Sequence, residues 1–147
     1  MSCLETYVLL RIFSQSLDPE EITRVLGIAA TQTRPMEPDS RYRPRREYHY
    51  WNWSSDSRVL SLNSLDHVRA VIELLQGKKQ QLEQLRGRGC QIDVWCHWVS
   101  SGQGGPCLDV PALAALAHLG LEILWDIYFG ASDEYANSTT GDSASGA

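Results

Sequence analysis

None of the four cysteines in this sequence has the CxxC spacing that is typical of zinc and redox sites. The four are Cys3, Cys90, Cys96 and Cys107. We therefore expect reduced thiols, no bound metal and a cytoplasmic location. Cys96 and its neighbour His97 point to opposite sides of a predicted strand, which argues against a shared metal or a nucleophilic cysteine-histidine pair.

Membrane and targeting signals are also missing. No window approaches the ~20 consecutive apolar residues of a membrane-spanning helix. The first residues lack the basic segment and the apolar core of a secretory signal. We therefore expect neither a membrane span nor secretion.

Signatures of nucleotide binding and catalysis are equally scarce. Neither the GxxxxGK[ST] phosphate loop nor the GxGxxG dinucleotide turn occurs. The arginines and aromatics over residues 41–51 are the best hint of nucleic-acid binding. The net charge of −5 and the lack of an RNP, helix-turn-helix or zinc-finger pattern outweigh that hint. We expect no cofactor, and we favour a protein without enzymatic activity while leaving that question open.

What the sequence does contain is clearest between residues 90 and 129. Alternating apolar residues over 91–99 predict a strand with one buried face. After a glycine-rich turn, Asp109 is placed to cap a helix over 110–118. Residues 121–129 alternate again and predict a second strand.

The N-terminal part repeats this order on a smaller scale. An alternating strand over 6–13 precedes Asp18-Pro19-Glu20-Glu21, which combines an N-cap, a proline at the first helical position and a capping box. In both parts a serine follows the strand, Leu-Asp precedes the helix and Leu-Gly ends it. Two such half-units are typical of the split βαβ pairs of ferredoxin-like folds.

Between these halves the pattern changes twice. Residues 31–46 are polar and contain several prolines, so we predict a long, mobile loop. Residues 47–55 alternate as a strand. An apolar stripe at helical spacing then covers 64–86, where Gly77 is placed to interrupt it.

These elements predict one α+β domain over residues 1–130. Its sheet should be mostly antiparallel, with four or five strands, and its helices should lie mainly on one face, with ferredoxin-like split βαβ repeats as the favoured variant. Residues 131–147 lack any apolar period and predict a disordered tail.

The order of the motifs resembles a bacterial family of domains of unknown function, DUF4279. The motifs that carry the resemblance are Tyr7-Val8-Leu9-Leu10-Arg11-Ile12-Phe13, Leu17-Asp18-Pro19-Glu20-Glu21-Ile22, the Trp51/Trp53 strand, Cys96-His97-Trp98-Val99-Ser100, Gly104-Gly105-Pro106, Leu119-Gly120-Leu121 and Asp126-Ile127-Tyr128-Phe129. The resemblance implies a compact α+β domain of bacterial origin and supplies no catalytic residues. Small domains of this sort often sit among toxin-immunity genes.

A candidate binding surface follows from the strand alternation. If helices cover the face that carries Val8 and Ile127, the aromatic and charged residues of the strands gather on the opposite face. There Arg11 is placed to pair with Asp93 or Asp126 across neighbouring strands. The candidate binding residues of this face are Tyr7, Arg11, Trp51, Trp53, Asp93, Trp95, His97, Asp126 and Tyr128.

This face has two interpretations. In one, the 31–46 loop and a helix cover it and make a second core with a buried ion pair. In the other it is an open surface for a partner, where Trp, Tyr and Arg are the typical anchors. On the second interpretation we expect a non-enzymatic protein-binding module, with an immunity-type inhibitor of a basic bacterial toxin as its concrete form.

The alternative function uses the turn between the last two strands. A small molecule or nucleotide, bound or converted by an enzyme, would occupy the cleft between the 100–107 loop and the open sheet face. The backbone N–H groups of Gly102, Gly104 and Gly105 could then face an anion ahead of a helix N-terminus. The plainer interpretation is a sharp connection from strand to helix.

Overall fold

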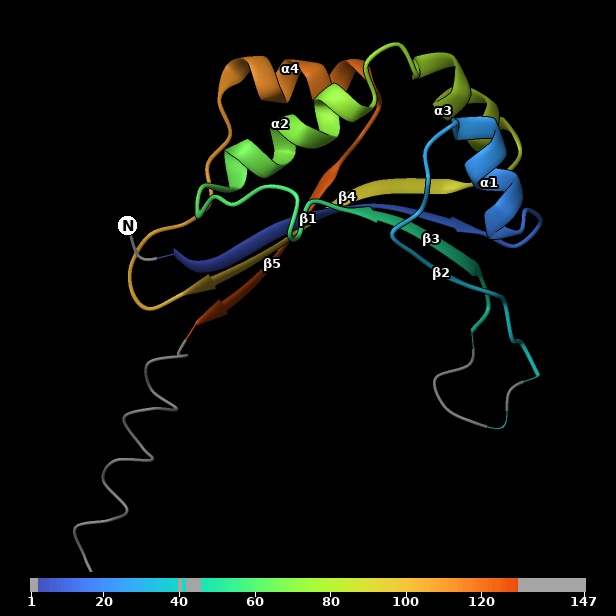
Figure 1. Cartoon of the computed structure of the whole chain (residues 1–147), viewed down its shortest axis with the longest axis horizontal. Helices are drawn as coiled ribbons and strands as arrows, with labels where there is room; N and C mark the ends of the chain where they lie inside the picture. Colours follow the sequence, from blue (N-terminus) through green and yellow to red (C-terminus); the bar gives the residue numbers. More distant parts are fainter. Residues whose placement is uncertain (1–2, 40, 42–45, 130–147) are drawn as a thin grey trace, which may run out of the picture.

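The computed structural model describes residues 3–39, 41 and 46–129, so the predicted tail and part of the predicted loop lie outside it. The described residues form a five-stranded sheet with four helices on one of its faces (Figure 1). The strands are β1 (Cys3–Ser14), β2 (Gln32–Arg34), β3 (His49–Ser54), β4 (Gln91–Ser100) and β5 (Ile123–Phe129). The helices are α1 (Pro19–Leu26), α2 (Ser64–Leu74), α3 (Lys79–Gly87) and α4 (Val110–His118). The α+β prediction is therefore confirmed. None of the described helices is long and apolar enough to cross a membrane.

The strands lie in the order β2-β3-β1-β4-β5. All neighbouring strands run antiparallel except β4 and β5, which are parallel. Because β3 lies between β1 and β2, the unit β1-α1-β2 has the split βαβ arrangement that the sequence predicted. In the second unit β4 and β5 are direct neighbours, so β4-α4-β5 is not split.

The repeated sequence order does produce equivalent helix ends. The Oδ1 atoms of Asp18 and Asp109 each accept a hydrogen bond at 2.9 Å from the backbone N–H three residues further on. These bonds satisfy groups that the first turn leaves unpaired. Gly27 and Gly120 end α1 and α4 with φ angles of 71° and 68°, in the left-handed region that glycine adopts at little cost.

The hydrophobic core lies between the sheet and the four helices. β1 and β4 supply the sheet side, where Val8, Leu10, Ile12, Val94 and Cys96 have no measurable exposure. The helices supply residues at helical spacing. These are Ile22, Leu26, Val68, Val71, Leu82, Leu85 and Leu116. Each such side chain contributes about 1.5–3 kcal/mol through burial.

Two details differ from the sequence prediction. The predicted 31–46 loop contains β2, a three-residue edge strand whose residues are all exposed. The alternation of apolar residues could not reveal it, because backbone bonds to β3 alone define it. The second detail is β5, where Ile127 was expected beneath the helices and keeps 38% of its surface exposed.

Candidate functional site

The sheet face turned away from the four helices is called the open face below (Figure 1). The strand register assigns residues of four strands to it. They are Tyr7, Leu9, Arg11, Phe13, Tyr50, Asn52, Asp93, Trp95, His97, Leu124, Asp126 and Tyr128. All the predicted binding residues except Trp51 and Trp53 lie on this face.

The assignment of Trp51 and Trp53 to the open face was wrong. The register places Trp51 opposite Ile12 and Trp53 opposite Leu10, so both lie on the helix-covered face. Trp51 is fully buried, and its indole N–H donates a 2.9 Å hydrogen bond to Oγ1 of Thr23 in α1. Alternation within β3 separates its two faces but cannot tell which one the helices cover, and the pairing with β1 decides that.

At the centre of the open face Arg11 and Asp93 form a two-pronged ion pair. Nε of Arg11 lies 2.7 Å from Oδ1 of Asp93, and Nη2 lies 2.8 Å from Oδ2. The side chains are only 21% and 16% exposed. The Arg11 guanidinium also lies 5.2 Å from the ring centroid of Phe13 and 5.9 Å from that of Trp95. Fork-to-fork geometry of this kind fixes the arginine in one orientation.

Beside this pair, three aromatic side chains pack around His97. Tyr7 stacks on the imidazole at a centroid distance of 4.7 Å, and Trp95 stacks on it at 5.8 Å. Tyr128 of β5 completes the group at 5.3 Å from His97. We call Tyr7, Trp95, His97 and Tyr128 the ring cluster. Its side chains are half-buried or exposed, so they present edges and faces to solvent on a rigid sheet.

Acidic groups surround the ring cluster. Burial first, and then the charges of nearby carboxylates including Glu5 and Asp126, raise the pKa of Tyr7. A side-chain hydrogen bond with Asp126, together with its charge, raises the pKa of Tyr128. Both phenols therefore stay neutral near pH 7 and can donate hydrogen bonds, while the carboxylates accept them.

The open face is covered at one end and uncovered at the other. At the β3 end, the Arg34 guanidinium lies 4.4 Å from the ring centroid of Tyr50, which is only 8% exposed. A small pocket of about 180 Å³ lies there, lined by Phe13, Arg34, Arg46, Glu47, Tyr48 and Tyr50. At the β4–β5 end, no described helix or strand covers the ring cluster, and Tyr128 is 51% exposed. The interpretation as a covered second core therefore describes the β3 end of the open face, and the interpretation as an open surface describes the β4–β5 end.

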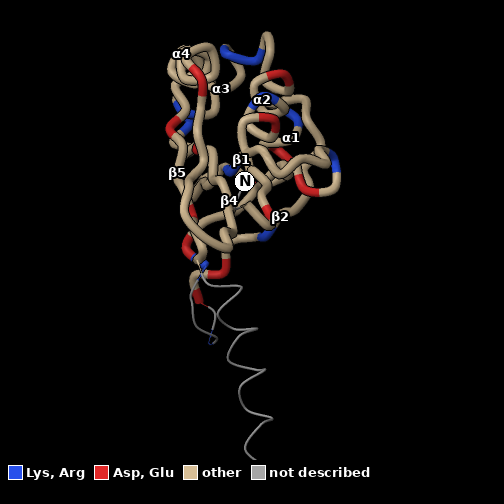
Figure 2. The backbone as a smooth tube through the Cα atoms, turned by 90° about the vertical axis from the view of Figure 1, so that its left-hand side faces the viewer, with Lys and Arg blue, Asp and Glu red and all other residues tan. Residues whose placement is uncertain are grey.

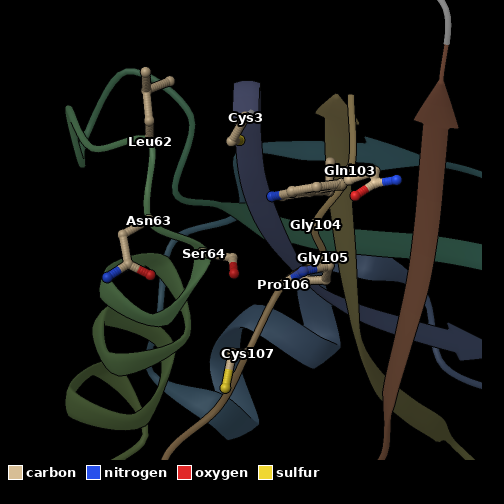
Figure 3. Close-up of a pocket in the computed structure, with 10 residues that line it drawn as sticks. Cys3, Leu62, Asn63, Ser64, Gln103, Gly104, Gly105, Pro106 and Cys107 are labelled. Atoms are coloured by element: carbon tan, nitrogen blue, oxygen red, sulfur yellow. The ribbon is translucent and has the colours of Figure 1, made fainter. Parts of the chain in front are cut away.

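The glycine-rich loop borders a different cavity, shown in Figure 3. This cavity of about 360 Å³ is lined by Cys3, Leu62, Asn63, Ser64, Trp98, Gln103, Gly104, Gly105, Pro106 and Cys107. Trp98 belongs to the helix-covered face. Asn63 and Ser64 place the cavity beside the start of α2. The cavity therefore lies on the helix-covered side of the sheet and not, as predicted, between the loop and the open face. Gly104 and Gly105 line this cavity on the helix side, and Gly102 is not part of its lining.

The cysteines and His97 lie as the alternation predicted. Cys90 and Cys96 are buried on the helix-covered side, whereas His97 lies on the open face. Burial raises the pKa of Cys96 to about 11, so its thiol stays protonated. Cys107 is exposed on the wall of the cavity. In the part of the chain that the structure describes, no three metal-binding side chains converge.

One buried polar group, the side chain of His67, was not predicted from the sequence. His67 is 1% exposed, and its Nε2 lies 2.8 Å from the carbonyl oxygen of Ser61. Its Nδ1 lies 2.7 Å from Oγ of Ser55, which accepts a bond from the backbone N–H of Val8. Since a carbonyl only accepts, Nε2 carries the proton, and Nδ1 accepts from the serine hydroxyl. A serine-histidine pair this deeply buried connects β1 to the segment before α2 and is inaccessible to a substrate.

Comparison with known proteins bears on the family alone. Neither the curated proteins nor the solved structures include a match to this chain. The family model described as "Domain of unknown function (DUF4279)" matches residues 4–130. That range contains every strand and helix described above except Cys3, the first residue of β1, and it includes the complete open face. The chain therefore belongs to the DUF4279 family.

Proposed function

We propose that this protein is a non-enzymatic binding module that recognises another protein through the β4–β5 end of the open face. The observation that carries the proposal is the ring cluster, which stands uncovered beside an arginine that Asp93 holds in place. Tyrosine, tryptophan and arginine are the commonest anchors of protein interfaces. Anchors already fixed on strands lose little conformational entropy when a partner binds.

Charge points to a basic partner. The chain carries a net charge of −5, and the carboxylates of Glu5 and Asp126 lie around the ring cluster. A basic protein surface would be attracted to this region, which speeds encounter at low salt. We propose as the concrete form an immunity-type inhibitor that acts in the bacterial cytoplasm on a basic toxin such as a nuclease.

The test begins with the product of the adjacent upstream gene and with proteins captured from the native host. Each purified candidate is titrated calorimetrically with the wild-type chain, with Trp95→Ala and with Leu60→Ala. Leu60 is 93% exposed in a loop before α2 and serves as the control truncation. We expect Trp95→Ala to weaken binding by about 2 kcal/mol or more, which is roughly 30-fold.

Thermal melts of the same variants separate binding from folding. Trp95 is only half-buried, so its truncation should leave the domain folded. A loss of stability of about 3–5 kcal/mol without a separable binding defect would assign Trp95 to structure. An affinity that does not fall as salt rises would contradict the basic partner.

The cavity beside the glycine loop supports a second candidate, a small anionic ligand such as a nucleotide. Its volume of about 360 Å³ lies within the range of ligand sites, about 300–1,000 Å³. A ligand that binds there should raise the melting temperature of the wild-type chain. A Cβ at Gly105 or at Gly102 would meet open space, and only Gly105 lines the cavity. Gly105→Phe should therefore abolish the shift, and Gly102→Phe should keep it.

A further inference from the structure

The two edges of the sheet are built differently. β2, at one edge, has three exposed polar residues, Gln32, Thr33 and Arg34, and Pro35 follows it. Short, polar and proline-flanked edges resist pairing with another chain. β5, at the other edge, has seven residues, of which Asp126 alone is charged. No described residue pairs with its outer side.

β5 carries large hydrophobic side chains on both faces, with Asp126 among them on the open face, and exposes them on both. Trp125, Ile127 and Phe129 point to the helix side with exposures of 37%, 38% and 67%. On the open face, Leu124 and Tyr128 are 40% and 51% exposed. A strand that is apolar on both faces is typical of the interior of a sheet. This one lies at the edge and lacks the lysines or prolines that protect natural edges.

Helix α4, which leads into β5, also exposes apolar side chains to solvent. It packs against α2, yet Val110 is 78% and Leu113 is 50% exposed. These two residues continue through Ala114 and Ala117 as an exposed stripe at helical spacing, so the outward side of the helix is also apolar. Figure 2 shows α4 above β5 on the same side of the molecule, opposite β2. No lysine or arginine occurs from residue 110 to residue 129.

We propose that a second copy of this chain pairs with this edge, β5 against β5 in antiparallel fashion, around a twofold axis perpendicular to the sheet. Such an axis keeps the helices of both copies on the same side of a continuous ten-stranded sheet, which follows from two sheets of five strands. It also brings the outward sides of the two α4 helices towards each other. The inference does not rest on the proposed function, because it is argued from the backbone edge of β5, although Asp126 and Tyr128 of the open face take part in both.

The hydrogen bonds to β4 show which backbone groups are free to pair. The backbone N–H of Val94 donates to the carbonyl oxygen of Glu122 at 3.0 Å. In a parallel pair this bond turns the polar groups of the even-numbered β5 residues towards β4. Alternation then turns those of the odd-numbered residues outward. These residues are Ile123, Trp125, Ile127 and Phe129.

The side chains select the register. Residues opposite each other must share a face, so the axis passes beside Trp125, Asp126 or Ile127. An axis at Asp126 would set two carboxylates directly opposite each other, and an axis at Trp125 would set Asp126 against Leu124. An axis at Ile127 sets each Asp126 opposite Tyr128 of the second copy, a neutral phenol in place of a second carboxylate, and Trp125 opposite Phe129. The strand is self-complementary in this last register alone, and we assign it.

The first test measures the oligomeric state by sedimentation velocity over a range of concentrations. We expect a reversible dimer with twice the 16.5 kDa mass of the chain. Ile127→Lys should raise the dimer dissociation constant about 30-fold or more, the size of a hot-spot loss. Thr33→Lys places the same charge on the β2 edge and should leave the constant unchanged. If Ile127→Lys fails to fold, Phe129→Lys replaces it, because Phe129 is 67% exposed.

The second test fixes the register by disulfide formation in a Cys107→Ser background, which removes the exposed thiol. In the assigned register Ile127→Cys meets its own counterpart at a Cα distance of about 5.5 Å, within disulfide range. Trp125→Cys would be about 14 Å from its counterpart and should not cross-link. A monomer at every concentration, a dimer that Thr33→Lys breaks and Ile127→Lys does not, or a cross-link at Trp125→Cys alone would each overturn the proposal.

Discussion

Arg11 and Asp93 face each other across the neighbouring strands β1 and β4 and are joined by two hydrogen bonds of 2.7 and 2.8 Å. Neighbouring rings and strands leave both side chains less than a quarter exposed. In such a place an unpaired charge is expensive, whereas a paired one costs little. The pair therefore serves the open face chiefly by holding the arginine in one orientation, with stability as a secondary effect.

This asymmetry between paired and unpaired charges can be measured. We expect Asp93→Ala to lower the free energy of unfolding by about 2 kcal/mol, because it leaves the Arg11 guanidinium half-buried without its partner. The double variant Arg11→Met/Asp93→Ala should regain most of that loss, since no charge is then left unpaired. Urea unfolding of the single and double variants completes the cycle. Strictly additive losses would show that the two side chains do not act as a pair.

The buried His67 network gives a second stability prediction. His67→Ala leaves the Ser55 hydroxyl and the Ser61 carbonyl without their partner and opens a cavity, so we expect a loss of about 3 kcal/mol in the free energy of unfolding. Ser55→Ala should cost less on its own. In the His67→Ala background its cost should fall but not vanish, because the Ser55 hydroxyl still accepts from the backbone N–H of Val8. Equal costs of Ser55→Ala in both backgrounds would contradict the shared network.

The sequence predicted the elements well and the sheet faces only in part. Capping residues and alternation are local signals, and they located α1, α4, β1 and β4 because each signal lies within the element that it defines. The faces of β1 and β4 were also correct, because each strand has one distinctly more apolar side. Arg11 could therefore be placed on one face with Asp93 and Asp126 as its two possible partners, and the strand register selects Asp93.

β3 shows why the rest could not be predicted. Its two sides carry Trp51 and Trp53 on one hand and Tyr50 and Asn52 on the other, and no local rule says which pair the helices cover. The pairing with β1 settles it, and that contact joins residues about forty positions apart in the sequence. β2 was missed for a related reason, since its side chains are exposed and polar and its pairing with β3 defines it.

Thiol burial predicts an order of chemical reactivity. Cys107 is exposed, whereas Cys3, Cys90 and Cys96 are buried and burial raises the pKa of each. The thiolate is the reactive form, so a disulfide reagent at mildly alkaline pH should modify Cys107 first and Cys96 last. Mass spectrometry of peptides after timed quenching measures the order. Modification of Cys96 as fast as Cys107 in the folded protein would contradict the packing of β4.

Asp109 connects the sequence motif, the fold and the dependence of stability on pH. Its Oδ1 accepts from the backbone N–H of Ala112 at the start of α4, and its Oδ2 lies 2.6 Å from Nη2 of Arg69 in α2. The backbone hydrogen bond first, and then the bond and charge of Arg69, lower the pKa of this carboxyl. A carboxyl whose pKa is lower in the folded state stabilises the protein above its unfolded pKa, about 3.9, and loses that effect as the pH falls through the lowered value.

Asp109→Asn isolates the charge, because asparagine caps a helix about as well as aspartate but cannot pair with Arg69 as an ion. We expect the variant to melt below the wild type at pH 7, and we expect the gap to narrow as the pH falls below about 3.9. Glu83→Gln on the exposed side of α3 removes one negative charge elsewhere and controls for net charge. Differential scanning calorimetry from neutral to acid pH measures the difference in melting temperature between each variant and the wild type. The melting temperature of Asp109→Asn relative to the wild type could instead stay constant with pH, or follow that of Glu83→Gln. Either outcome would show that the negative charge of Asp109 does not stabilise the contact between α2 and α4.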